Sequence, residues 1–424
     1  MASPLTARIM EEYASAAHLL PAAELAERHA AIEALRVSGL PTSRDENWKY
    51  ANLRSLERQR FVPAATAAPL AGAGLPARLA GFPRYGFVDG VFATGSSAPI
   101  DASGARITPG TSGNAHRSFS ADERFALLNQ AFATGGVTLQ VPAAGSEPAR
   151  LELVFLASAD SKAGACYPRV DIRMDPGASL TLIERHLSAG EQASFVASAV
   201  TIDLQPGARL EHYRLQELNP RSILFDTVSA ELARESAYRL HCISTGAQAA
   251  RSTLAVRLNG ERAELNLAVA ALGGGQQVQD AYALVEHHAP HARTEQTFRG
   301  IAAGRARVAF NGKIVVAKGA RGTDSRQSLR GLLAGPEAEI DVRPQLEIYT
   351  DDVRCSHGAT AGKLDDNMLF YLLSRGLTPE SAQRLLKWAF LEDVVAQIAL
   401  PALRRQIEER LADHLGDDTL RELL

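Results

Sequence analysis

Residues 85–350 consist of short stretches in which apolar and polar side chains alternate, and Gly, Pro or Asn separates one stretch from the next. The segment 254–258, with Leu, Val and Leu at every second position, is one example. Alternation at period two places the apolar side chains on one face of a β-strand. This region is therefore expected to be built from β-strands.

A turn motif recurs ahead of these strands. The sequence DPGASL at 175–180 returns 30 residues later as QPGARL at 205–210. Weaker copies are NGERAEL (259–265), AGRARV (303–308) and GPEAEI (335–340). Each copy places a turn before a strand that opens with a small residue. Repeated units of this length predict a solenoid of stacked β-coils, and a β-sandwich with irregular loops is the alternative. Aromatic residues make up only 6% of the chain, which favours the β-helix because its interior is too narrow for many large rings.

The N-terminal region has a helical pattern that ends at Gly39. Ser43 and Glu46 have the spacing of a capping box, which predicts a further short helix carrying Trp48. Residues 63–81 are rich in Ala, Pro and Gly, and we interpret them as a linker without regular structure.

The C-terminal region is also helical in pattern. Thr378, Pro379 and Glu380 supply an N-cap, a first-turn proline and an acidic first turn, and an apolar stripe follows. We therefore divide the chain into an N-terminal helical region with its linker (1–84), a β-helix core (85–360) that contains one short helix at 125–132, and a C-terminal helical domain (361–424).

The overall charge and the cysteine count exclude several classes of protein. Lys and Arg number 45 against 48 Asp and Glu, a net charge of −3, and a protein that binds the phosphate backbone of nucleic acids is expected to be basic. The three cysteines, Cys166, Cys242 and Cys355, are far apart and form no CxxC pair, so a disulfide framework is disfavoured. No signal peptide or long apolar segment is recognisable. We expect a soluble, cytoplasmic protein that binds neither nucleic acid nor membrane.

One stretch combines a thiol and an imidazole. In the segment 342–376, Val353, Cys355, His357 and Ala359 alternate and should share one face of a strand. The pair could have a purely structural role. In that interpretation Cys355 is buried and packs as a small apolar residue, and His357 is hydrogen-bonded to the backbone. If the pair is functional, two ligands cannot complete a metal or cluster site, which requires about four. The other ligands would have to come from elsewhere, including another subunit.

This segment resembles the C-terminal signature of the SufB/SufD family of iron–sulfur cluster assembly proteins. The matching residues are DDVRCSHGAT (351–360) and LFYLLSRGL (369–377), with further similarity in FNGKIVV (310–316), HHAPHARTEQTFRG (287–300), FALLNQAF (125–132) and SRDENWKYANL (43–53). The resemblance thus covers most of the chain. The CSHGA motif is intact, whereas RGTDSRQSLRGLLAG (321–335) lacks the cysteine typical of SufB-like chains, and both points favour the SufD branch.

The resemblance implies a right-handed parallel β-helix core with helical terminal regions. It also implies a SufB-like paralogous subunit and a SufC-like ABC ATPase as partners, and we expect residues 365–424 to dock the ATPase. By the same resemblance His357 contributes a metal ligand to a cluster that forms transiently at the subunit interface, with Cys355 as a tentative second group. The isolated chain is expected to hold no stable cofactor, to form a possible homodimer and to have no enzymatic activity.

Other motifs give weaker alternatives. Glu286, His287, His288 and His291 suggest a metal site, but Pro290 argues against the helix that would align them. The triple glycine at 273–275 is not followed by the Gly-Lys-Ser/Thr of a P-loop, so it supplies no ATPase chemistry.

Two further functions remain open at this point. Asp351 and Asp352 are a candidate acid pair, which keeps a carbohydrate-active β-helix enzyme as the alternative function, although neighbouring strand residues point to opposite faces. A structural homo-oligomer is the third possibility.

Overall fold

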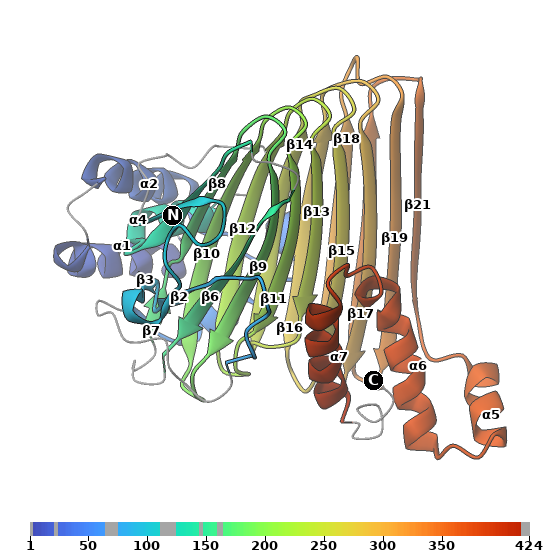
Figure 1. Ribbon diagram of the computed structural model, residues 1–424. Helices are drawn as coiled ribbons and strands as arrows, with labels where there is room; N and C mark the ends of the chain where they lie inside the picture. Colours follow the sequence, from blue (N-terminus) through green and yellow to red (C-terminus); the bar gives the residue numbers. More distant parts are fainter. Residues whose placement is uncertain are drawn as a thin grey trace.

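The computed structural model describes residues 3–20, 24–63, 75–110, 124–143, 147–158 and 164–416. Its centre is a parallel β-solenoid in which successive strands alternate between two sheets (Figure 1). Sheet A contains β1 (Val62–Pro63), β4 (Arg106–Pro109), β5 (Gly136–Val141), β7 (Gly164–Cys166), β8 (Arg169–Met174), β10 (Ser194–Leu204), β12 (Ile223–Leu232), β14 (Ala249–Leu258), β16 (Val278–His287), β18 (Arg307–Val316) and β20 (Glu339–Ile348). Sheet B contains β2 (Arg84–Val88), β3 (Val91–Phe92), β6 (Ala149–Ala157), β9 (Ser179–Ser188), β11 (Arg209–Glu217), β13 (Ala237–Ser244), β15 (Glu264–Gly273), β17 (Arg293–Ala303), β19 (Thr323–Ala334) and β21 (Val353–Gly362). The predicted mainly β solenoid is confirmed.

The 30-residue recurrence is the repeat of one coil. Strands β9 and β11 follow the two PGA turns and pair in parallel, with Leu210 opposite Leu180. NGERAEL likewise leads into β15 of sheet B, whereas AGRARV and GPEAEI lead into β18 and β20 of sheet A. The weaker copies therefore belong to two series of turns, one for each sheet, and not to a single series.

The turns before the sheet B strands form a hydrogen-bonded column. The amide of Gly177 donates to the carbonyl of Pro206, and the amide of Gly207 donates to that of Arg234. The column continues through residues with positive φ at Glu235, Arg262, His291 and Gly322. A left-handed conformation is natural for glycine but costs energy in other residues, and here the amide of each such residue donates to a backbone carbonyl of the next coil. The small residues that follow are fully buried, as at Ala178 and Ala208.

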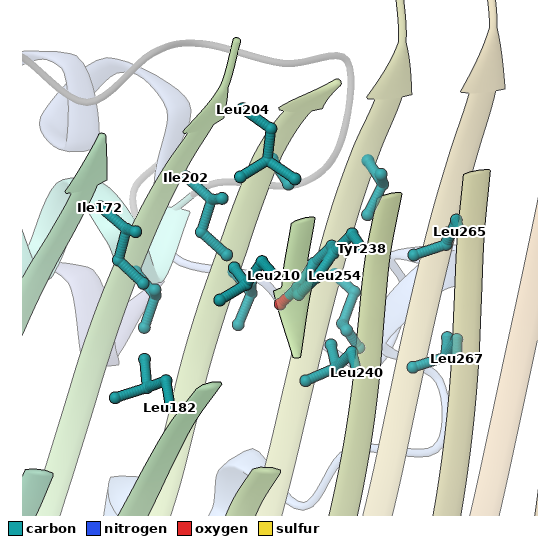
Figure 2. Packing of buried hydrophobic residues seen from close by; sticks show 14 of the residues in the cluster. Ile172, Leu182, Ile202, Leu204, Leu210, Tyr238, Leu240, Leu254, Leu265 and Leu267 are labelled. Atoms are coloured by element: carbon teal, nitrogen blue, oxygen red, sulfur yellow. The ribbon is translucent and has the colours of Figure 1, made fainter. Parts of the chain in front are cut away.

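Side chains from both sheets fill a common interior (Figure 2). Rows of aliphatic residues stack from coil to coil; Leu240 lies opposite Leu267, and Tyr238 lies opposite Leu265. Because each alternate residue of a strand points inward, burial of one face fixes the register of every coil. A second group of large rings lies outside this interior, between the N-terminal helices and the outer face of sheet A.

Helices cover parts of both outer faces. The N-terminal region contains α1 (Pro4–Ala16), a 3₁₀ turn at Ala17–Leu19, α2 (Leu25–Ser38) and α3 (Leu53–Arg58), while α4 (Arg124–Phe132) follows within the solenoid region and packs on sheet A. A further 3₁₀ turn occupies Thr94–Ser96. The helix predicted at 125–132 and the helix ending at Gly39 are both confirmed, and the amide of Gly39 bonds to the Leu35 carbonyl.

The predicted capping box at Ser43 and Glu46 is wrong. The Asp45 carboxylate instead accepts from the backbone amide and the hydroxyl of Thr42, at 2.7 and 2.8 Å. This closes a loop that continues only as a 3₁₀ turn at Glu46–Trp48. Trp48 is nonetheless buried against sheet A, with the guanidinium of Arg251 4.5 Å from its ring. Of the predicted linker, 75–81 contains no helix or strand, Pro63 belongs to β1, and 64–74 lie outside the described residues.

The C-terminal region contains α5 (Asp366–Ser374), α6 (Pro379–Val395) and α7 (Pro401–Leu415). Thr378 caps α6 by accepting from the amide of Ser381, as the sequence predicts. Helices α6 and α7 pack on the outer face of sheet B, and α5 extends away from the solenoid (Figure 1). Among the described residues, no helix has both the length and the apolar character needed to cross a membrane.

Candidate functional site

Among the described residues, no segment caps the solenoid at its C-terminal coil. Within the same residues, β20 is the last strand of sheet A and pairs only with β18, and β21 is the last strand of sheet B and pairs only with β19. Both strands are much more exposed than those before them. Two edges with free backbone groups therefore lie side by side at one end of the molecule, and such edges are ready to pair with other strands.

Apolar side chains of both sheets line this open end. On β20 the inward residues include Ile340, Val342 and Leu346, which contact the interior core but stay partly exposed. On β21 Val353 and Cys355 do the same. In an earlier coil these positions are covered by the next coil, so the open end presents core residues to solvent.

Cys355 and His357 lie within this end, two residues apart on β21. Cys355 is opposite Ser325 and His357 is opposite Gln327, and both partners on β19 are buried. Cys355 is half-buried, and the imidazole of His357 is exposed. The structure thus brings the two residues predicted from the sequence onto one face, at the rim of the open coil.

The surroundings of Cys355 disfavour the thiolate form of its side chain. Burial, followed by the nearby Asp324 carboxylate, raises the pKa of Cys355 above its usual value, while the backbone amide of Ser325 acts in the opposite direction. The thiolate is the form that binds metals. The raised pKa disfavours the thiolate of Cys355 in the isolated chain, so His357 is the stronger candidate ligand of the two.

These two side chains do not form a complete metal site. Within the part of the chain that the structure describes, no group of three or more His, Cys, Asp or Glu residues is arranged to hold a metal ion. A tetrahedral iron site needs about four ligands. Any cluster at this end would therefore need ligands from outside the chain.

The other candidate motifs are dispersed. Glu286 bonds to Arg257 on the outer face of sheet A, and His287 is buried and bonds to the Thr294 hydroxyl at 2.9 Å. His288 is exposed, and His291 belongs to the column of turns. These four side chains have separate surroundings and separate structural roles.

Two further motifs lie on turns. Asp351 and Asp352 occupy the exposed turn between β20 and β21, where the carbonyl of Asp352 accepts from the amide of Gly322. The glycines at 273–275 end β15 and form the turn that follows it.

Sequence reasoning missed a charged cluster inside the solenoid. The carboxylate of Glu184 bonds to His186 at 2.7 Å, to His212 at 3.0 Å and to Arg214 at 2.8 Å, and Arg214 also pairs with Asp226. Burial acts to raise the pKa of Glu184, but Arg214 and the two histidines hold it well below its usual value. The sequence contains one indication of this cluster: in LIERHL (182–187), Glu184 and His186 occupy alternate positions that continue the inward face of the strand. The cluster is enclosed by the coils, so we assign it to the packing of the interior.

Comparison with known proteins identifies the family. The model of the SUF system iron–sulfur cluster assembly SufBD core domain matches residues 155–390. The chain is 31% identical over 394 residues to the iron–sulfur cluster assembly protein SufD of Escherichia coli, which covers 92% of each chain. It is also 28% identical over 406 residues to an iron–sulfur cluster assembly SufBD family protein of Synechocystis, covering 90% of this chain and 89% of that one. With its β-solenoid and its intact CSHGA motif at the open coil, the chain belongs to the SufBD family of the SUF iron–sulfur cluster assembly system, as a protein of the SufD type.

Proposed function

We propose that this chain is a non-catalytic scaffold subunit whose open coil joins a SufB-like paralogous subunit, and that an iron–sulfur cluster is built at the junction. The observation that carries the proposal is the position of His357, exposed on the core-facing side of β21, where both sheet edges are unpaired. A partner solenoid that extended both sheets would cover Ile340, Val342 and Leu346 and would bring its own side chains to His357.

The cluster is the cargo of this junction. A neutral imidazole is a competent iron ligand, and His357 would supply one donor from this chain. Cys355, with its raised pKa, would support the site. The remaining donors would come from the partner, since the described residues form no group of three or more His, Cys, Asp or Glu that could hold a metal. We place this assembly in the cytoplasm, with a pair of identical chains as the form adopted when the partner is absent.

The substitution His357→Ala tests the proposal. The side chain is exposed, so its loss should change the free energy of unfolding by no more than about 0.5 kcal/mol. The complex co-expressed with the SufB-like and ATPase subunits should still form, but its iron and sulfide content should fall markedly. Cys355→Ala should cause a milder loss. A stable His357→Ala complex with full cluster content would refute the role of His357.

We also propose that α5 docks the SufC-like ATPase. Its sequence DNMLFYLLS is mostly apolar, and it has no buried residue. Met368, Phe370 and Tyr371 are 60%, 72% and 55% exposed. An apolar helix exposed to this extent is typical of a docking surface.

The experiment on α5 must leave the rest of the C-terminal region in place. Removing everything after Asp365 would uncover the apolar face of sheet B on which α6 and α7 pack, so such a truncation would test folding as well as docking. Phe370→Glu changes only an exposed side chain and should abolish capture of the ATPase with the melting temperature unchanged. Glu380→Gln, at the start of α6, is the control. Full capture by the Phe370→Glu chain would place the docking surface elsewhere.

The alternative function, a carbohydrate-active β-helix enzyme, is not supported. The two acids proposed for it, Asp351 and Asp352, lie on an exposed turn, and the family to which the chain belongs assembles iron–sulfur clusters.

A further inference from the structure

A row of polar side chains runs through the interior towards His357. Gln296 on β17 lies opposite Gln327 on β19, and Gln327 lies opposite His357 on β21. Gln296 is 0% exposed and Gln327 is 3% exposed. The row therefore begins inside the solenoid and ends at the open coil, where each residue is the nearest neighbour of the next on the same inward face.

The orientation of the Gln327 amide is set by its partners. Its Nε2 donates to Oε1 of Gln296 at 3.0 Å and to the backbone carbonyl of Gly312, on the opposite sheet, at 3.0 Å. A backbone carbonyl only accepts hydrogen bonds, so the atom that faces Gly312 must be the nitrogen. The amide cannot be reversed without losing this bond.

Gly312 is the residue that makes this arrangement fit. A Cβ atom at this position would lie 2.7 Å from Nε2 of Gln327 and 2.8 Å from Oε1 of Gln296. Any other residue here would displace the two amides. The glycine within FNGKIVV thus leaves space for both glutamines to reach across the interior to sheet A.

With both of its N–H groups engaged, Gln327 has one unused atom. Its Oε1 is buried and has no hydrogen-bond partner among the residues that the structure describes. A buried acceptor that remains unpaired is costly. Gln296 occupies one side of the Gln327 side chain, and His357 is the neighbour on the other side.

We propose that Gln327 is a positioning residue for His357: the exposed imidazole turns inward about its side-chain torsions, and its N–H then donates to the unpaired Oε1 of Gln327, which fixes the tautomer. In a neutral imidazole one nitrogen donates and the other accepts. An N–H held by Gln327 leaves the other nitrogen with its lone pair free to bind iron at the junction. Metal-binding histidines are commonly oriented in this way by an acceptor on their second nitrogen. This inference rests on the proposed role of His357 and extends it to a residue in the preceding coil.

The test measures the tautomer directly. Full-length chain labelled with ¹⁵N-histidine is studied by NMR about two pH units above the usual histidine pKa of ~6.5, where imidazoles are neutral. The His357 signals are assigned by their loss in His357→Ala. In the wild-type chain one tautomer of His357 should dominate, and in Gln327→Met, which keeps the length of the side chain but removes the acceptor, both should be populated. A wild-type spectrum with both tautomers mixed as in a free imidazole would overturn the inference, whatever the variants do.

A further variant separates positioning from packing. Gln296→Met removes a member of the same row that does not adjoin His357, and it should leave the tautomer unchanged. In the assembled complex Gln327→Met should lower the iron content about 10-fold or more, the effect typical of losing an orienting partner of a metal ligand, while Gln296→Met should not. Equal losses from both would show that the effect is structural.

These experiments distinguish an error in the positioning role of Gln327 from an error in the proposed function of His357. If His357→Ala keeps full cluster content, the role of His357 is wrong, yet the tautomer measurement still decides whether Gln327 orients it. If His357→Ala loses the cluster while Gln327→Met changes neither tautomer nor iron content, only the positioning role is wrong.

Discussion

Replacing His241 with Phe should remove part of the protein's sensitivity to acid. His241 is 3% exposed and stacks on Tyr213, with 5.2 Å between ring centroids, beneath the connection between α6 and α7. That connection is tied to the sheet by a bond from the amide of Ala399 to the Tyr213 hydroxyl. Neither nitrogen of His241 has a hydrogen-bond partner in the described parts of the chain. Burial, and then Arg239, lower the pKa of His241 to about 4.

The sign and size of the effect follow from this shift. The unfolded chain takes up a proton on this histidine at a pKa of ~6.5, and the folded chain does so only near 4. Stability is therefore complete above that unfolded pKa and is lost as the pH falls towards 4. At pH 5 the difference amounts to about 2 kcal/mol for this one group. Phe cannot take up the proton and keeps the stacking on Tyr213, so the loss between pH 7 and pH 5 should be smaller by about that amount.

Urea unfolding of the full chain at pH 7 and pH 5, followed by circular dichroism, measures the effect. The matched control is His288→Phe, because His288 is exposed and its ring meets water in both the folded and the unfolded state. His241→Phe should be at least as stable as the wild type at pH 7. If wild type and His241→Phe lose the same stability between pH 7 and pH 5, His241 is not held neutral by burial and the reasoning is refuted.

Two other substitutions test the interior and the N-terminal contact. Gly312→Ala should cost about 1–3 kcal/mol by forcing the two glutamines apart, whereas Gly358→Ala, where an added Cβ meets nothing within 4 Å, should be neutral; equal melting temperatures for both would contradict the close fit at Gly312. Arg251→Met should cost about 3–5 kcal/mol because it leaves the buried Asp280 carboxylate without its partner, and adding Asp280→Asn should recover much of that loss in urea unfolding. No recovery in the double variant would show that the cost comes from packing.

The sequence was a good guide to the repeating part of the fold, because burial of one face imposes a period of two that is visible in the residues themselves. The PGA turns at 175–180 and 205–210 were equally visible, since glycine was used for the left-handed position. In later coils Glu235, Arg262 and His291 occupy that position, so the turn persists while its sequence signal is lost. The assignment of the later turns to two sheets could not be read from spacing alone.

The candidate site could be predicted only in part, for a related reason. Alternation and resemblance indicate Cys355 and His357 as candidates, but their exposure depends on the whole solenoid, because no described coil follows β21. The link from Gln327 to Gly312 crosses between sheets, and no local pattern reports such a contact. The Thr42–Asp45 loop is a case in which a local pattern was present but misleading. Ser43 and Glu46 have the spacing of a capping box, but the hydrogen bond from the neighbouring Thr42 to Asp45 forms in its place.

The two ends of the solenoid differ in a way that limits how it can assemble. At the N-terminal end sheet B finishes in β3, an antiparallel strand of two residues, and sheet A finishes in β4, an antiparallel strand of four residues, and in β1, a parallel strand of two. Edges this short are poor templates for a full coil. In the part of the chain that the structure describes, only the C-terminal end offers a full parallel edge in both sheets. The pairing proposed above would use that edge in both subunits. Growth would then stop at two solenoids, so that stackable coils with exposed edges would form a closed pair and not a fibre.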